Sequence, residues 1–77
     1  MEGAIKLLQF CIEQREAGNM FIFGYLGYMD KYEIWGAKGL LSEQTVVVQS
    51  SEYWTSPEDL TPERADQIIN EIKEKLK

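Results

Sequence analysis

Carboxylates are the only side chains abundant enough in this chain to support catalysis. Two neighbouring pairs stand out, Glu58 with Asp59 and Glu63 with Asp66. Paired acids can act as general acid and general base when burial separates their pKa values. Both pairs lie in a polar loop or in the first turn of an expected helix, where ionised carboxylates interact favourably with the helix N-terminus. We therefore interpret these acids as capping and solvated side chains, and we expect no catalytic residue.

The other reactive residue types are scarce. The 77 residues include no His and one Cys, Cys11, which excludes a disulfide framework, a zinc site built from Cys and His, and most nucleophile–base pairs. Cys11 falls in an apolar run, which predicts a buried and unreactive thiol. Gly24 and Gly27 lack the Lys-Ser/Thr of a phosphate-binding loop, so we expect strand glycines that mark a bulge or close packing. The sequence predicts a protein that is not an enzyme and needs no cofactor or metal.

An acidic segment, residues 52–66, combines charge with aromatic side chains. It contains five acids and one base, and so carries −4 of the net charge of −5. Tyr53 and Trp54 lie inside it. Aromatic side chains beside acids can dock on a basic protein surface, with the charges raising the association rate and the aromatics supplying affinity. A solvated loop followed by a charged helix start is the alternative interpretation.

We expect a partner-binding site centred on this segment and extended by aromatic residues of the predicted sheet. Its candidate residues are Trp54, Tyr53, Glu52, Glu58, Asp59, Trp35 and Phe23. The predicted function is to occupy the surface of another protein, one with a basic surface, as inhibitors, immunity proteins and anti-defence proteins do. The alternative is a homodimer or larger homo-oligomer, a structural or accessory subunit that associates through an open sheet face.

Charge and hydropathy exclude other partners. Eight Lys and Arg stand against thirteen Asp and Glu, whereas nucleic-acid binding needs clustered positive charge. The most apolar stretch, residues 20–29, is far shorter than the roughly 20 residues of a membrane helix. No basic stretch leads into an apolar region at the N-terminus, and an unpaired Cys fits a reducing compartment. We expect a cytoplasmic protein that binds neither nucleic acid nor membrane.

The elements that position these residues follow from the apolar pattern. Residues 2–17 carry apolar side chains over a broad arc at helical spacing, with polar residues opposite, which predicts a helix. Residues 20–29, 32–37 and 45–50 are rich in aromatic and β-branched residues and predict three strands. A loop from Lys38-Gly39 through Glu43 and an irregular segment, residues 51–60, connect the later elements.

The final helix has the sharpest signal in the chain. Thr61 is a favoured capping residue, and Pro62 follows it at the first helical position. The apolar residues of this helix form one narrow stripe: Ala65, Ile68, Ile69, Ile72 and Leu76. A stripe of this kind predicts a helix that covers one surface of a core.

The order helix, three strands, helix in one domain, residues 1–77, predicts an α+β fold of the type α-β-β-β-α. Short connections make the strands an antiparallel meander. Each helix has one apolar side, so the simplest arrangement places both helices on one face of the sheet.

The second sheet face should expose apolar surface. The first strand sends apolar side chains to both faces: Phe21, Phe23, Tyr25 and Met29 to one, and Met20, Ile22, Leu26 and Tyr28 to the other. The second strand separates Tyr32 and Ile34 from Glu33 and Trp35. Residues 51–60 could fold back as a lid over the uncovered face. Otherwise that face is a binding surface for a partner or for a second copy.

The start of the final helix, residues 61–66, reads Thr-Pro-Glu-Arg-Ala-Asp. The α-β-β-β-α order resembles that of the double-stranded-RNA-binding domain, which places lysines at this helix start. Acids stand here instead, so the resemblance is one of topology and implies no RNA binding. The tail has Trp54-x-x-Pro57, then Leu60-Thr61, and then a helix with Ile68, Ile69 and Ile72. This tail, about a third of the chain, is similar to tails of small bacterial immunity proteins.

Overall fold

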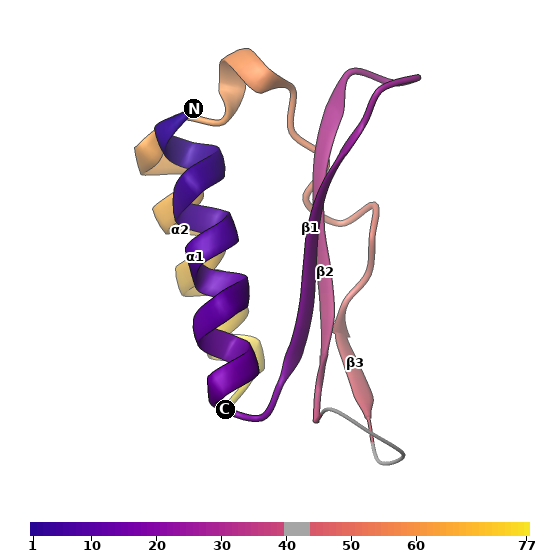
Figure 1. The fold of residues 1–77 in the computed structure, drawn as a ribbon, viewed down its shortest axis with the longest axis vertical. Coiled ribbons are helices and arrows are strands. Elements are labelled where there is room, and N and C mark those ends of the chain that lie inside the picture. Colours follow the sequence, from indigo (N-terminus) through magenta and orange to yellow (C-terminus); the bar gives the residue numbers. More distant parts are fainter. Residues whose placement is uncertain (40–43) are drawn as a thin grey trace.

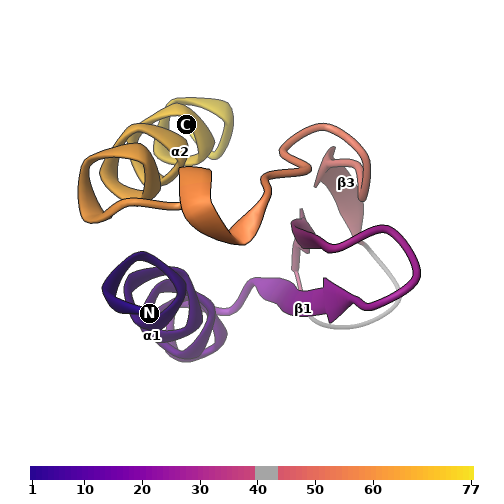
Figure 2. The ribbon, with the colours of Figure 1, turned by 90° about the horizontal axis from the view of Figure 1, so that it is seen from above.

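The computed structural model describes residues 1–39 and 44–77. In order, the elements are α1 (Glu2–Glu16), β1 (Met20–Leu26), β2 (Lys31–Lys38), β3 (Thr45–Val48), the short 3-10 helix η1 (Pro57–Asp59) and α2 (Pro62–Lys75). The strands form one antiparallel sheet in the order β1-β2-β3. Both helices lie on the same side of this sheet (Figure 1, Figure 2). The predicted α+β class, the α-β-β-β-α order and the single helix-covered face are confirmed.

The first strand is shorter than predicted. β1 ends at Leu26 rather than at residue 29, because residues 27–30 turn the chain into β2. Asp30 closes this turn with a left-handed φ of 53°. Its carboxylate accepts a hydrogen bond from the Tyr25 hydroxyl at 2.6 Å. An Asp side chain tolerates this backbone conformation better than most residues, which is why the turn forms without the Asn-Gly or Asp-Gly pair that favours tight hairpins.

The third strand is also shorter than predicted. β3 ends at Val48 rather than at residue 50. The Glu52 amide donates a hydrogen bond to the Gln49 carbonyl at 3.1 Å, and this turn takes the chain out of the sheet. Of the predicted loop from Lys38-Gly39 through Glu43, Lys38 is the last residue of β2, and residues 40–43 lie outside the described residues.

The helices cover the sheet face that carries Phe21 and Ile34. These two side chains are 8% and 1% exposed. Phe10 of α1 meets the Phe21 ring edge to face, with 5.5 Å between the ring centroids. The core cluster comprises Ala4, Leu7, Phe10, Cys11, Phe21, Ile34, Val48, Tyr53, Leu60, Ala65, Ile68 and Ile72. The side chains that alternate away from this core form the second face of the sheet, which we call the open face.

Gly36 of β2 lies in close contact with β1. It pairs with Phe21, and a Cβ atom at this position would lie 2.5 Å from Cγ of the Phe21 ring and would overlap the Met20 carbonyl oxygen. The register toward β3 shifts between Gly36 and Ala37, which is the signature of a β-bulge. Gly24, where the sequence predicts a bulge or close packing, pairs with Glu33 without a register shift and has no atom within 4 Å of such a Cβ, and Gly27 lies in the turn rather than in a strand. The close packing expected of a strand glycine is therefore found at Gly36.

The start of α2 is as the sequence predicts. The Thr61 hydroxyl accepts a hydrogen bond from the Arg64 amide at 3.1 Å, and Pro62 occupies the first helical position. The chain just before this cap crosses α1 at Gly3. A Cβ on Gly3 would lie 2.8 Å from the Thr61 carbonyl oxygen and closer still to that of Leu60. Backbone contact thus holds the N-terminal ends of both helices together.

Candidate functional site

The open face is apolar along its centre. Ile22 of β1 pairs with Trp35 of β2, and Gly24 pairs with Glu33. Ile22 is 40% exposed and Val46 of β3 is 61% exposed, whereas the Trp35 side chain is half-buried. Residues 51–60 do not cover this face as a lid, since they lead from the β3 edge to the helical layer (Figure 1, Figure 2).

Trp54 joins the open face through a short continuation of the sheet. The Tyr32 amide donates to the Thr55 carbonyl at 2.8 Å, and the Thr55 amide donates back to the Tyr32 carbonyl at 3.1 Å. Successive side chains of an extended segment point to opposite faces. Tyr53 and Thr55 are buried on the helix side, so Trp54 points the other way and is 42% exposed. By this alternation Trp54 lies on the same face as Glu33 and its neighbours.

A shallow hollow of about 570 Å³ lies on the open face. Its lining includes Glu33, Trp35 and Val46, together with residues 48–50. Within residues 1–39 and 44–77 the Glu33 carboxylate has no hydrogen bond or ion pair. An unpaired carboxylate beside an indole ring suits an Arg or Lys side chain, because the acid accepts its hydrogen bonds and the ring attracts its charge.

Tyr53, predicted to contact a partner, lies in the core instead. It is 6% exposed, and its hydroxyl donates to Oε1 of Glu71 at 3.1 Å. The Lys75 ammonium lies 5.1 Å from the centre of its ring. Burial, followed by the hydrogen bond to Glu71, raises the pKa of Tyr53 above its usual value. Its side chain attaches the segment before η1 to α2.

Two of the three acids in residues 52–59 also have local partners. Glu52 forms an ion pair with Lys75 at the end of α2. Asp59 accepts a hydrogen bond from the Ser56 hydroxyl at 2.7 Å, which closes the turn that contains η1. Glu58 is exposed in η1 and has no bonded partner among the described residues. Glu52 and Asp59 are therefore engaged with side chains of this chain and not with a shared charged surface around Trp54.

The remaining two candidates fall on opposite faces of the sheet. Phe23 is on the helix side, where its ring stacks on Tyr32 with 5.2 Å between the centroids. Trp35 is on the open face. Of the seven predicted residues, the structure therefore brings Trp54 and Trp35 to one surface, and it adds Glu33, Ile22 and Val46 to them.

Two other potentially reactive residues, Cys11 and Asp66, have structural roles in the fold. Burial raises the pKa of the Cys11 thiol to about 11, so the thiol is protonated at neutral pH. Asp66, one of the paired acids, forms an ion pair with Lys6 at 3.1 Å. In the part of the chain that the structure describes, no three His, Cys, Asp or Glu residues gather where a metal ion would bind.

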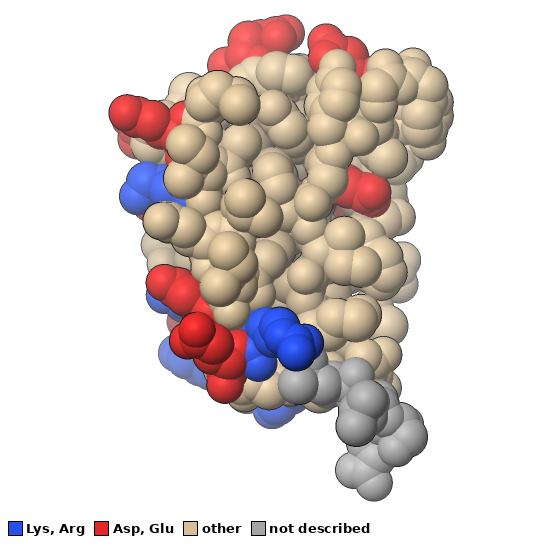
Figure 3. All heavy atoms as spheres, in the orientation of Figure 1, with Lys and Arg blue, Asp and Glu red and all other residues tan. Residues whose placement is uncertain are grey.

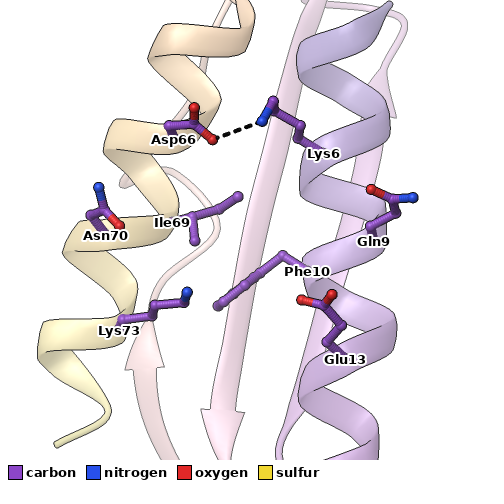
Figure 4. Close-up of a pocket in the computed structure, with 8 residues that line it drawn as sticks. All are labelled: Lys6, Gln9, Phe10, Glu13, Asp66, Ile69, Asn70 and Lys73. Atoms are coloured by element: carbon purple, nitrogen blue, oxygen red, sulfur yellow. Dashed lines mark hydrogen bonds and ion pairs between the residues drawn. The ribbon is translucent and has the colours of Figure 1, made fainter.

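A groove of about 350 Å³ separates the outer sides of the two helices (Figure 4). Phe10 and Ile69 form its floor, and the Lys6–Asp66 ion pair crosses it at one end. Glu13 and Lys73, among the other lining residues, add one charge of each sign. Balanced charge over an apolar floor is typical of two packed amphipathic helices, and it offers no set of groups that would select a ligand.

A second exposed apolar surface was not predicted. Ile5, Leu8 and Ile12 of α1 are 51%, 50% and 56% exposed. They are spaced three and four residues apart and so form one stripe along the helix. The signal in the sequence is the width of the apolar arc of this helix, which is larger than one packing surface can cover. We call these three residues the α1 stripe.

Comparison with protein-family models, with curated proteins and with solved structures finds no match to this chain. Among the described residues, no helix is long and apolar enough to cross a membrane.

Proposed function

We propose that this chain is a non-enzymatic binding protein that acts by occupying the surface of another protein with its open face. The observation that carries this proposal is that Trp54, Trp35 and Val46 share one face with Glu33, whose carboxylate has no bonded partner among the described residues. Tryptophan is enriched among the residues that dominate binding energy, and a carboxylate in apolar surroundings gives specificity for a positive charge.

The partner that fits this surface presents an Arg or Lys side chain within an apolar patch. A guanidinium group would bond to Glu33 and stack on the ring of Trp35, while flanking apolar side chains cover Val46 and Trp54. The net charge of −5 would raise the rate at which a basic partner associates. Self-association of two open faces is the competing proposal, but it would bring two Glu33 carboxylates into one apolar contact, which like-charge repulsion opposes.

Affinity capture from the native cell lysate tests this proposal. The tagged wild-type chain is compared with Trp54→Ala, with Glu33→Gln and with the control Tyr28→Ala. Tyr28 is 85% exposed in the β1–β2 turn, so its variant removes a more accessible aromatic ring that lies outside the open face. We expect one stoichiometric partner with the wild type and with Tyr28→Ala, and at least about tenfold weaker binding for the other two variants.

Binding by the purified partner is then measured against salt. An interaction that depends on Glu33 should weaken as ionic strength rises in the wild type, and this dependence should be smaller in Glu33→Gln. Retention of full affinity by both Trp54→Ala and Glu33→Gln would refute the open face as the contact surface.

A further inference from the structure

The side of the molecule formed by α1 and the edge strand β1 carries little charge. In Figure 3 the centre of this side is uncharged, and the Lys, Arg, Asp and Glu atoms lie mainly along its margins. The α1 stripe runs along it. β1 itself, Met20–Leu26, contains no charged residue and no Pro. In a chain with a net charge of −5, this is the side that a second acidic molecule can approach with least repulsion.

β1 is also an edge strand whose outer side has no partner within the described residues. It pairs with β2 alone, so alternate residues turn their amide and carbonyl groups outward. Proteins protect such edges with charged residues, prolines, bulges or a covering helix. Charged residues and prolines are absent from Met20–Leu26, and among the described residues the register shift lies between β2 and β3 and not at β1. A covering element is therefore the protection that is left.

The same side offers both a ridge and a recess. The α1 stripe is the ridge. A hollow of about 340 Å³ lies beside it, where Cys11 and Ile12 of α1 face Met20 and Phe21 at the start of β1. A two-fold axis parallel to the strands would place the α1 stripe of one copy against β1 and this hollow of the other, and the reverse. Two-fold symmetry requires this kind of self-complementary surface.

We propose that two copies of this chain associate through the α1–β1 side, with α1 of each copy covering the β1 edge of the other. The α1–β1 side is large enough for a protein interface. The molecule measures 35 by 24 Å in the view of Figure 1, which looks onto this side. This outline encloses on the order of 800 Å², so a contact that covers most of this side reaches what each partner contributes to a standard interface. This proposal uses a different surface from the open face and stands independently of the proposed function.

Light scattering after size-exclusion chromatography, over a wide range of protein concentrations, tests the proposal. The wild type should approach twice the monomer mass of 8.9 kDa. Leu8→Glu places a charge in the centre of the α1 stripe and should raise the dissociation constant at least ~100-fold, because a buried unpaired charge is strongly unfavourable. Leu8 is half-exposed, so this variant should keep the helical content of the wild type.

Two control variants make the outcome specific. Gln9→Glu adds the same charge to the next residue, which is exposed and points to the polar side of α1, and should remain dimeric. Trp54→Ala alters the open face and should also remain dimeric. Amide hydrogen exchange of residues 20–26 should slow as the concentration rises in the wild type, and should not do so in Leu8→Glu.

Three results would overturn the proposal. A wild-type protein that stays monomeric at the highest concentration would refute the dimer. A dimer that survives Leu8→Glu would show that the contact lies elsewhere, and one lost in Trp54→Ala would place it on the open face. Because partner capture depends on Glu33 and Trp54, failure of this dimer leaves the proposed function intact, and the reverse also holds.

Discussion

Gly36→Ala should destabilise the protein, although alanine usually improves on glycine within a strand. The added Cβ would lie 2.5 Å from Cγ of Phe21 and would overlap the Met20 carbonyl oxygen. Phe21 has little freedom to move away, because it is 8% exposed and its ring packs on Phe10 at 5.5 Å. Overpacking of this kind costs about 1–3 kcal/mol. Alanine also lowers the conformational entropy of the unfolded chain, which offsets up to ~1 kcal/mol of this cost.

The net expectation is a loss of about 1–2 kcal/mol in the free energy of unfolding. A domain of 77 residues has roughly 4–12 kcal/mol in all. The loss should therefore lower the melting temperature by roughly 4–16 °C. Urea unfolding followed by tryptophan fluorescence measures it, provided that the m-value stays unchanged.

Gly24→Ala is the matched control on the neighbouring strand. It makes the same chemical change one strand away, where no atom lies within 4 Å of the new Cβ and φ is not positive. This variant should be as stable as the wild type or more stable, by up to ~1 kcal/mol. Equal stability of Gly36→Ala and the wild type, or an equal loss in both variants, would refute the close contact between Gly36 and Phe21.

Three further predictions concern the helices and the buried thiol. Gly3→Ala should cost about 1–3 kcal/mol in a thermal melt, although helix propensity alone favours alanine by about 1 kcal/mol, because its Cβ meets the Leu60 carbonyl oxygen. Thr61→Ala should cost about 1 kcal/mol in urea unfolding through loss of the bond from the Arg64 amide, and Thr61→Ser should retain most of it. The Cys11 thiol has a folded pKa of about 11 against 9.0 in the unfolded chain. Burial of the protonated thiol therefore contributes fully to the free energy of unfolding below pH 9, and this contribution is lost as the pH rises toward 11. Unfolding measured at a series of alkaline pH values should show that the free energy of unfolding falls by about 2–3 kcal/mol across this interval, and this fall should be missing in Cys11→Ala. An identical fall in both proteins would contradict this role of the thiol.

The open face was only partly predictable, and Tyr53 and Trp54 show why. Both are aromatic and adjacent, and both lie in an acidic segment, so nothing in their local sequence separates them. The bridge between Thr55 and Tyr32 makes this segment extended and thereby sends the two rings to opposite faces. That bridge joins residues far apart in the chain, and no local pattern signals it.

The acids illustrate the same limit. Their clustering in the sequence suggested one charged surface, whereas in the fold Glu52 reaches Lys75 on α2 and Asp59 closes a turn with Ser56. Glu33, which attracted no functional interpretation in the sequence, gains one because Trp35 and Val46 come to lie around it from two strands.

The sequence by itself determined the elements and their order, because helix caps, apolar periodicity and β-branched runs act over a few residues. Thr61-Pro62 and the narrow stripe of α2 are the clearest cases. The tertiary structure decided which of two apolar faces of β1 the helices cover, since both faces satisfy the same alternation. It also left Ile5, Leu8 and Ile12 of α1 outside the core, because α2 and one sheet face can bury only part of so broad an apolar arc.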